Sequence, residues 1–247
     1  MAGAYPTMTL FPIVTITPMK GLLYCSMTVV VYLTAWQLHN RFKYSMLNPL
    51  LVSILVVVGI LLVGNIPYSD YEQGGDWLSN LLGIAVVALG VPLYQQMRDI
   101  HRELTGVILV VFVSSLFALV STVILAVLAG ADGQVALSLA PKSVTTPIAV
   151  LIVDNLNGVP SLAAIAVILT GLMGAIFGLP LLSLLKITDP KARGIAMGTA
   201  CHALGTARMV QSSLKEGAYS ALALVLSASI SALMAPWLVP WVLGWLN

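Results

Sequence analysis

The chain has 247 residues, of which 59% are apolar and only 8% are charged, and its net charge is +2. An average soluble domain carries about 25% charged residues, so 11 basic and 9 acidic side chains cannot cover a soluble protein of this size. This composition excludes an ordinary soluble enzyme, a disordered chain and a nucleic-acid-binding protein. The mean hydropathy of +1.00 instead predicts an all-α polytopic membrane protein embedded in a lipid bilayer.

The first 20 residues are predicted to form an irregular tail. They contain Pro6, Pro12 and Pro18, which are poorly compatible with a helix. After the tail, charged residues delimit the runs that could cross lipid, because charges in the hydrocarbon core are costly. Six apolar runs reach the roughly 20 residues that a crossing helix needs. They cover residues 21–40, 44–69, 77–97, 104–131, 155–185 and 217–247, and the first four make up a unit of four transmembrane helices at 21–131.

Two further segments are apolar but interrupted. Residues 133–153 contain Lys142 between two prolines, and residues 194–213 contain His202 and Arg208 among many Gly, Ala and Thr residues. Broken helices at membrane depth are tolerated where they are buried in protein or line a watery cavity. We therefore expect two broken or re-entrant segments.

The distribution of basic residues favours re-entry over full crossing. Apart from Lys142 and Arg208, the chain has nine basic residues. If both broken segments re-enter, eight of the nine lie on one side and Lys20 alone lies on the other, whereas full crossing divides them five to four. We expect six full spans, two re-entrant segments and both termini outside. An acidic loop is then also outside, with Asp70, Glu72 and Asp76.

The second half of the chain is predicted to be an inverted repeat of residues 132–186 and 187–247. Each unit consists of a broken segment, a short polar loop and a long apolar helix. If each unit crosses the membrane once, the second is inverted, which is typical of secondary transporters whose site lies at the midplane. Chance similarity between Gly/Ala/Ser-rich helices is the alternative. The aligned pairs, 59 or 61 residues apart, are Gly158 with Gly217, Ser161 with Ser220, Ser138 with Thr199, and Thr145 with Thr206.

Three small residues, Gly171, Gly174 and Gly178, follow one another at helical spacing in the fifth run. In membranes such spacing lets a second helix approach closely. We expect a helix to pack against this face.

Lys142 is the residue that most strongly suggests a function. A cation at the centre of a span costs about 2.5–3.5 kcal/mol. Pro141 and Pro147 free backbone groups around it, and a helix that begins after Pro147 would point partial positive charge inward. The pattern predicts an anion site, and a lysine that snorkels to the interface is the alternative. The neighbouring hydroxyl residues of this site are Ser143, Thr145 and Thr146.

The second broken segment supplies Thr199, His202, Thr206 and Arg208 as further candidates. Thr199 and Thr206 share a face if the helix is continuous. His202 is either a ligand donor or proton carrier near neutral pH, or a hydrogen-bonded core residue. Arg208 either contacts the substrate or marks the cytoplasmic interface.

The signs of these charges favour a small anion as substrate, because no Asp or Glu falls inside a long apolar run. Cation transporters usually place carboxylates there. The sequence has no nucleotide-binding glycine motif and no arguable metal cluster or catalytic triad. We therefore expect no cofactor, no metal and no enzymatic activity.

Six motifs resemble the LrgB/CidB family of bacterial membrane proteins, which includes bacterial relatives of the plastid glycolate/glycerate translocator. The most specific are PKSVTTPIA at 141–149 and HALGTAR at 202–208. The other four lie at residues 47–51, 87–94, 193–199 and 216–220.

The resemblance implies a multi-pass protein of the bacterial inner membrane and leaves two functions open. One is a holin/antiholin-like regulator of murein hydrolase activity and lysis, acting with a small LrgA/CidA-type membrane protein. The other is a carrier of glycolate-, glycerate- or pyruvate-like acids.

The charges favour the carrier, coupled to protons through His202. In this hypothesis Lys142 pairs with the substrate carboxylate and the hydroxyl residues bind its oxygens. A homo-oligomer is compatible with both functions.

Overall fold

The computed structural model describes residues 18–42, 47–88 and 90–246, and within these ranges all regular structure is helical. The all-α polytopic fold is confirmed. The helices are α1 (Pro18–Phe42), α2 (Pro49–Val63), α3 (Tyr68–Ala88), α4 (Gly90–Gln95), α5 (Met97–Leu128), α6 (Gly133–Leu139), α7 (Thr146–Asn155), α8 (Pro160–Leu184), α9 (Pro190–Ser212) and α10 (Leu214–Leu246).

Four helices in the described ranges, α1, α5, α8 and α10, are long and apolar enough to cross a membrane. They coincide with four of the six predicted runs. The run at 44–69 forms the 15-residue α2, which is about 22 Å long and shorter than a bilayer core of about 30 Å. Within the run at 77–97, residues 77–88 belong to α3 and residues 90–95 to α4, and residue 89 lies outside the described ranges.

Two boundaries near the N-terminus differ from the prediction. Residues 18–20 of the predicted tail are helical, as the first described residues of α1. Residues 1–17 of the predicted tail lie outside the described ranges. The predicted acidic loop is helical: α3 begins at Tyr68, and Asp70 in its first turn complements the helix dipole. Asp70 also pairs with Lys20 of α1 at 3.3 Å.

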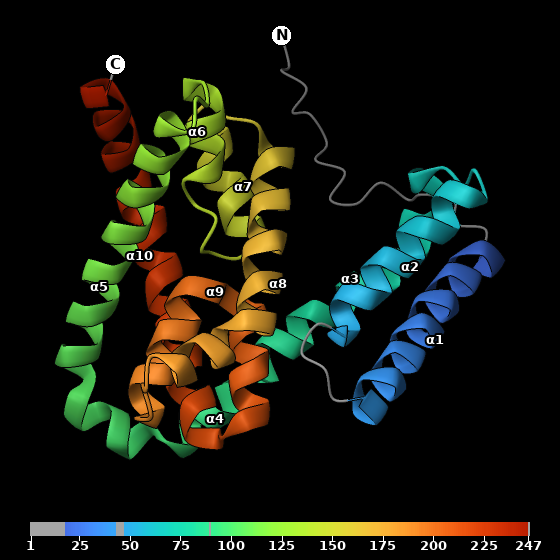
Figure 1. The fold of residues 1–247 in the computed structure, drawn as a ribbon, viewed down its shortest axis with the longest axis horizontal. Helices are drawn as coiled ribbons and strands as arrows, with labels where there is room; N and C mark the ends of the chain where they lie inside the picture. Colours follow the sequence, from blue (N-terminus) through green and yellow to red (C-terminus); the bar gives the residue numbers. More distant parts are fainter. Residues whose placement is uncertain (1–17, 43–46, 89, 247) are drawn as a thin grey trace, which may run out of the picture.

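Helix α1 packs against both α2 and α3, and these three helices stand beside the rest of the molecule (Figure 1). Helix α4 follows them and packs against α10. The remaining helices, α5 to α10, form the body that holds the candidate site.

Helices α6 and α7 form a re-entrant hairpin, here called hairpin 1 (residues 133–155). Pro141 ends the first limb and Pro147 lies in the first turn of the second. Gln134 Nε2 donates a hydrogen bond to Asn157 O at 3.4 Å, and Val159 N donates to Ser138 Oγ at 2.7 Å. The segment therefore returns to the side from which it came.

Helix α9 is also a hairpin, here called hairpin 2 (residues 190–212). Its backbone leaves helical geometry at Cys201 and at His202, whose φ is 42°. Gly198 of the first limb and Thr206 of the second limb both lie against Ser220 of α10. The two limbs therefore run side by side, and this segment also re-enters.

The two long helices that follow the hairpins run in opposite directions (Figure 1). Helix α8 leads from the end that holds Asn157 to the loop that holds Lys186, and α10 leads back. Ion pairs join Lys191 to Glu103 and Arg193 to Glu216, which brings the starts of α5, α9 and α10 together. We call this side, with Lys186, the basic end, and the side of Asn157 the opposite end.

The predicted close packing on the glycine face of α8 is confirmed, and the partner is hairpin 2. A Cβ at Gly171, Gly174 or Gly178 would collide with a side chain of hairpin 2. His202 Nε2 and Val167 O of α8 are 2.8 Å apart. The three contacted side chains are His202, Cys201 and Met197.

We predict that the basic end faces the cytoplasm. In a Cys25→Ser background, Thr188→Cys in the loop before α9 should be protected from an impermeant thiol reagent applied to intact cells. Asp154→Cys at the opposite end is the matched control, because both side chains are exposed, and it should label readily. Rapid labelling of the Thr188 variant from outside would overturn this orientation.

Candidate functional site

A cavity of about 1210 Å³ lies between α5, α8 and hairpin 2 and reaches the tip of hairpin 1. Lys142 and Ser143 line it at one end, and Asp189 and Lys191 line it at the basic end. The cavity thus connects Lys142, in the turn of hairpin 1, with the basic end. It joins the tips of the two hairpins, since Cys201 at the tip of hairpin 2 lines it as well.

The deep end of the cavity offers hydrogen-bond donors without partners. Lys142 is half-buried, and among the described residues no carboxylate lies within ion-pair distance of its Nζ. Thr199 is only 4% exposed, and its Oγ1 has no hydrogen-bond partner in the described part of the chain. Buried polar groups normally have hydrogen-bond partners. The groups without partners at this end of the cavity are therefore suited to binding a polar ligand.

The local sequence explains why hairpin 1 turns at this depth. Pro141 cannot continue α6, and the chain turns through residues 140–145 before α7 begins at Thr146. Thr145 caps α7 without a side-chain hydrogen bond. The N-terminus of α7 therefore adds unpaired N–H groups and partial positive charge near the turn that carries Lys142.

The other predicted site residues lie away from the cavity lining. Thr145 and Thr146 are half-buried beside the turn. Thr206 is fully buried and bonds His202 O at 3.0 Å and Ser220 Oγ at 2.9 Å. Arg208 is exposed and contacts Gln211, as expected of a residue at the interface. Of the eight predicted residues, the cavity brings together Lys142, Ser143 and Thr199.

Thr199 and Thr206 do not share one helical face, because α9 is not continuous. The break at Cys201 and His202 places them on different limbs. Thr199 faces the cavity, whereas Thr206 ties the second limb to α10. His202 is buried at the tip, where its ring contacts α8.

Sequence reasoning missed several polar residues of the lining. Ser114 and Ser121 of α5 and Thr170 of α8 line the cavity. The sequence of α5 did contain a usable signal, because the residues of α5 that line the cavity recur at the spacing of one helical face. They are Val110, Val113, Ser114, Phe117, Ala118 and Ser121.

Ion pairs that the sequence did not reveal join the helices at the basic end. Glu216, the residue that delimits the last apolar run, is only 5% exposed, and its Oε1 lies 3.1 Å from Arg193 Nε. Lys191 lies in the first turn of hairpin 2, lines the mouth of the cavity and donates a hydrogen bond to Glu103.

These features define a class: a helical membrane protein in which two re-entrant hairpins meet at a cation-bearing cavity. The chain belongs to the LrgB-like family, whose model matches residues 28–241. It is 36% identical to the uncharacterized protein YwbG of Bacillus subtilis over 84% of this chain and 92% of that relative. It is 30% identical to the holin-like protein CidB of Staphylococcus epidermidis over 86% of this chain and 93% of that relative. No solved structure matches.

We predict that substitution by valine destabilises the protein at Thr206 and does not destabilise it at Thr199. Thr206→Val removes two buried hydrogen bonds and should lower the free energy of unfolding by about 1–3 kcal/mol. Thr199→Val removes an unpartnered hydroxyl and should leave stability unchanged or slightly higher. Thermal unfolding of the detergent-purified variants measures the difference, and an equal loss in both would show that Thr199 is bonded in solution.

Proposed function

We propose that this protein is a secondary transporter of small monocarboxylates of the glycolate, glycerate or pyruvate class. The observation that carries the proposal is the unpaired Lys142 beside Ser143 and Thr199 in one cavity. In this proposal the carboxylate pairs with Lys142, and the hydroxyls bind its oxygens or the 2-hydroxy or 2-oxo group of the substrate.

The electrostatics support an anion over a cation. At a given distance, charges attract more strongly in a low-dielectric interior than in water, so an unpaired ammonium there favours an anionic ligand. Lys191 at the mouth is paired with Glu103 and lies beside Asp189, so the preference for an anion depends on Lys142.

Accumulation of an anion requires a driving ion, because a negative-inside potential opposes entry by about 2.3 kcal/mol per charge at 100 mV. Proton coupling through His202 stays a prediction. The ring is buried next to the lining residue Cys201 and contacts Val167 O. The position of His202 at the tip of hairpin 2 supports a coupling between the hydrogen bond of its ring and the binding of substrate in the cavity.

The second candidate is a holin-like regulator of murein hydrolase activity and cell lysis. Its specific support is the name holin-like protein CidB, which the relatives from Staphylococcus epidermidis and Staphylococcus aureus carry. These names favour the holin-like function over any particular transport substrate. In this alternative the chain acts with an LrgA/CidA-type membrane protein.

Both candidates share one setting, which we also propose: the bacterial cytoplasmic membrane, no enzymatic activity, and assembly as a homo-oligomer or with a small membrane partner. Exposed apolar side chains on α1, α2 and α5 support contacts with lipid or with other membrane helices.

Uptake by purified protein separates the two candidates. In liposomes, the carrier should take up labelled pyruvate, glycolate or glycerate with a rate that saturates as concentration rises. The neutral analogue glycerol, measured in parallel, should enter no faster than it enters protein-free liposomes. A holin-like pore would instead pass many solutes without saturation, and that result would overturn the transport proposal.

Lys142 should be essential for substrate binding and dispensable for folding. Lys142→Ala removes a charge that is costly in the membrane, so the variant should insert and unfold like the wild type. Its substrate affinity should fall by about 10–100-fold, the equivalent of one charge-assisted hydrogen bond. Lys142→Arg should bind weakly, because a planar guanidinium replaces a compact ammonium. Equilibrium binding of labelled substrate tests this, and wild-type affinity in Lys142→Ala would contradict the assignment.

A further inference from the structure

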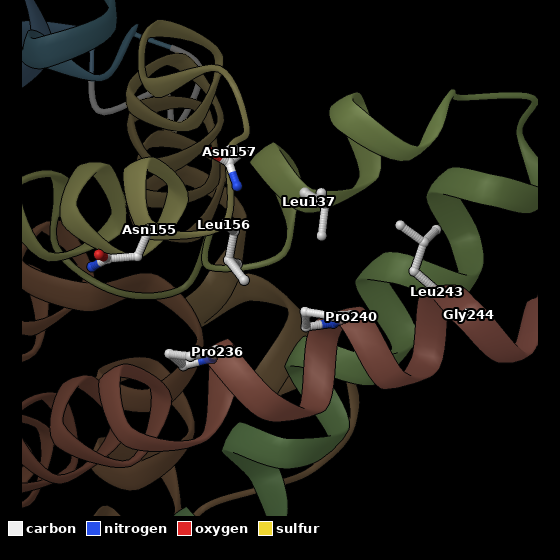
Figure 2. Close-up of a pocket in the computed structure, with 8 residues that line it drawn as sticks. All are labelled: Leu137, Asn155, Leu156, Asn157, Pro236, Pro240, Leu243 and Gly244. Carbon is white, nitrogen blue, oxygen red and sulfur yellow. The ribbon is translucent and has the colours of Figure 1, made fainter.

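A second pocket, of about 470 Å³, lies at the opposite end of the molecule from the basic end (Figure 2). Figure 2 shows the end of α7 and the α6 residue Leu137 on one side, and α10 on the other. The pocket is lined by Leu137, Asn155, Leu156, Asn157, Pro236, Pro240, Leu243 and Gly244.

This pocket corresponds to the large cavity through the repeat. The cavity lies between hairpin 2 and α8, whereas the pocket lies between hairpin 1 and α10. Phe177 and Leu181 of α8 line the cavity, and the residues 59 positions later, Pro236 and Pro240, line the pocket. Each space thus lies between one hairpin and the long helix of the other repeat unit, at opposite ends of the molecule.

The turn of hairpin 1 that carries Lys142 and the part of α10 that lines the pocket contribute side chains to one buried apolar cluster, and we call five of these side chains the apolar seam. All of its side chains are small or β-branched, and none is more than 6% exposed. Among the described residues, no hydrogen bond joins hairpin 1 to α10, whereas Ser138 ties hairpin 1 to the start of α8. The seam consists of Ala140, Val144, Ala228, Ala235 and Val239, which belong to one buried cluster.

Hairpin 2 is held more firmly in the corresponding position. His202 contacts Val167 O of α8, and Thr206 bonds Ser220 of α10. The glycine face of α8 brings the backbones close together. The contact between hairpin 1 and α10 is therefore the one that can separate without breaking a hydrogen bond.

Helix α10 is also weakened where it lines the pocket. Pro236 and Pro240 cannot donate the hydrogen bonds that would close two helical turns, so the carbonyls of Ala232 and Pro236 lack those partners. Prolines are the usual site of helix bending.

We propose that the pocket of Figure 2 is the closed outer vestibule of the permeation path. It opens when hairpin 1 separates from the C-terminal half of α10 along the apolar seam, and the small carboxylate then reaches Lys142 from that side. This inference rests on the proposed transport function and assigns the path on the opposite side of the membrane from the large cavity.

A reversible clamp across the pocket tests the proposal. A Cβ built at Gly133 lies 3.3 Å from Leu243 Cδ2, and Leu243→Cys removes that contact and provides a thiol. The Gly133→Cys/Leu243→Cys protein should lose pyruvate uptake on oxidation and regain it on reduction. Oxidised protein should still bind pyruvate at wild-type affinity, because the inner cavity stays accessible.

The control pair is Ser138→Cys/Gly158→Cys, which bridges hairpin 1 and the loop before α8 at an existing contact and lines neither the pocket nor the cavity. Both proteins keep the native Cys25 and Cys201, so effects of those thiols cancel. Oxidation of the control should leave uptake unchanged. Unchanged uptake in the oxidised clamp would overturn the outer vestibule while transport stands, and absence of both uptake and binding in reduced protein would remove both proposals.

Labelling from the opposite side provides a readout that does not depend on the substrate. Val239 of the seam is 1% exposed, so Val239→Cys should react slowly with an impermeant maleimide, and only when the pocket opens. The oxidised Gly133/Leu243 clamp should abolish that reaction if it is formed before a Val239→Cys protein is labelled. Equal labelling rates with the clamp open and closed would contradict the proposed opening.

Discussion

A chain that turns back inside a bilayer must bury its non-helical backbone against protein, because lipid offers no hydrogen bonds. In this protein the glycine face of α8 supplies the surface for hairpin 2. A Cβ at Gly174 would overlap Cys201. The break at Cys201 and His202 can therefore pack against α8 only because α8 has no side chain at this position. The depth of hairpin 2, and with it the position of Thr199 in the cavity, follows from this contact.

The non-helical turn of hairpin 1 is also buried against protein, but the residues that surround it are of a different kind. This turn is made by prolines and lies among alanines and valines, including Ala140, Val144 and Ala228. Van der Waals contact between small side chains is weaker than a set of hydrogen bonds and close backbone contacts. The two hairpins therefore have similar architecture and unequal attachment, which agrees with the large cavity at the basic end and the smaller pocket at the opposite end.

The sequence was sufficient to predict features that follow directly from the cost or the size of individual residues in a lipid bilayer. Lys142 between two prolines predicted a broken segment, and the spacing of Gly171, Gly174 and Gly178 predicted close packing. It was insufficient where the outcome depends on tertiary contacts. A positive φ is uncommon for a residue other than glycine, so local preference does not predict it at His202. Because this break in α9 was not predicted, Thr199 and Thr206 were expected to share one helical face. The burial of Glu216 likewise depends on Arg193, which approaches it only in the folded protein.

The two candidate functions place their demands on different parts of the molecule. A carrier needs the interior: an unpaired cation, an unpartnered hydroxyl and hairpins that can separate from the long helices. Regulation of lysis with a membrane partner needs exterior helix faces, and α1, α2 and α5 carry exposed residues such as Leu22, Leu55 and Leu109. A charge at depth, which costs about 2.5–3.5 kcal/mol, is not needed to form such exterior contacts. The presence of Lys142 in the cavity therefore argues that the interior is used, whatever assembles on the surface.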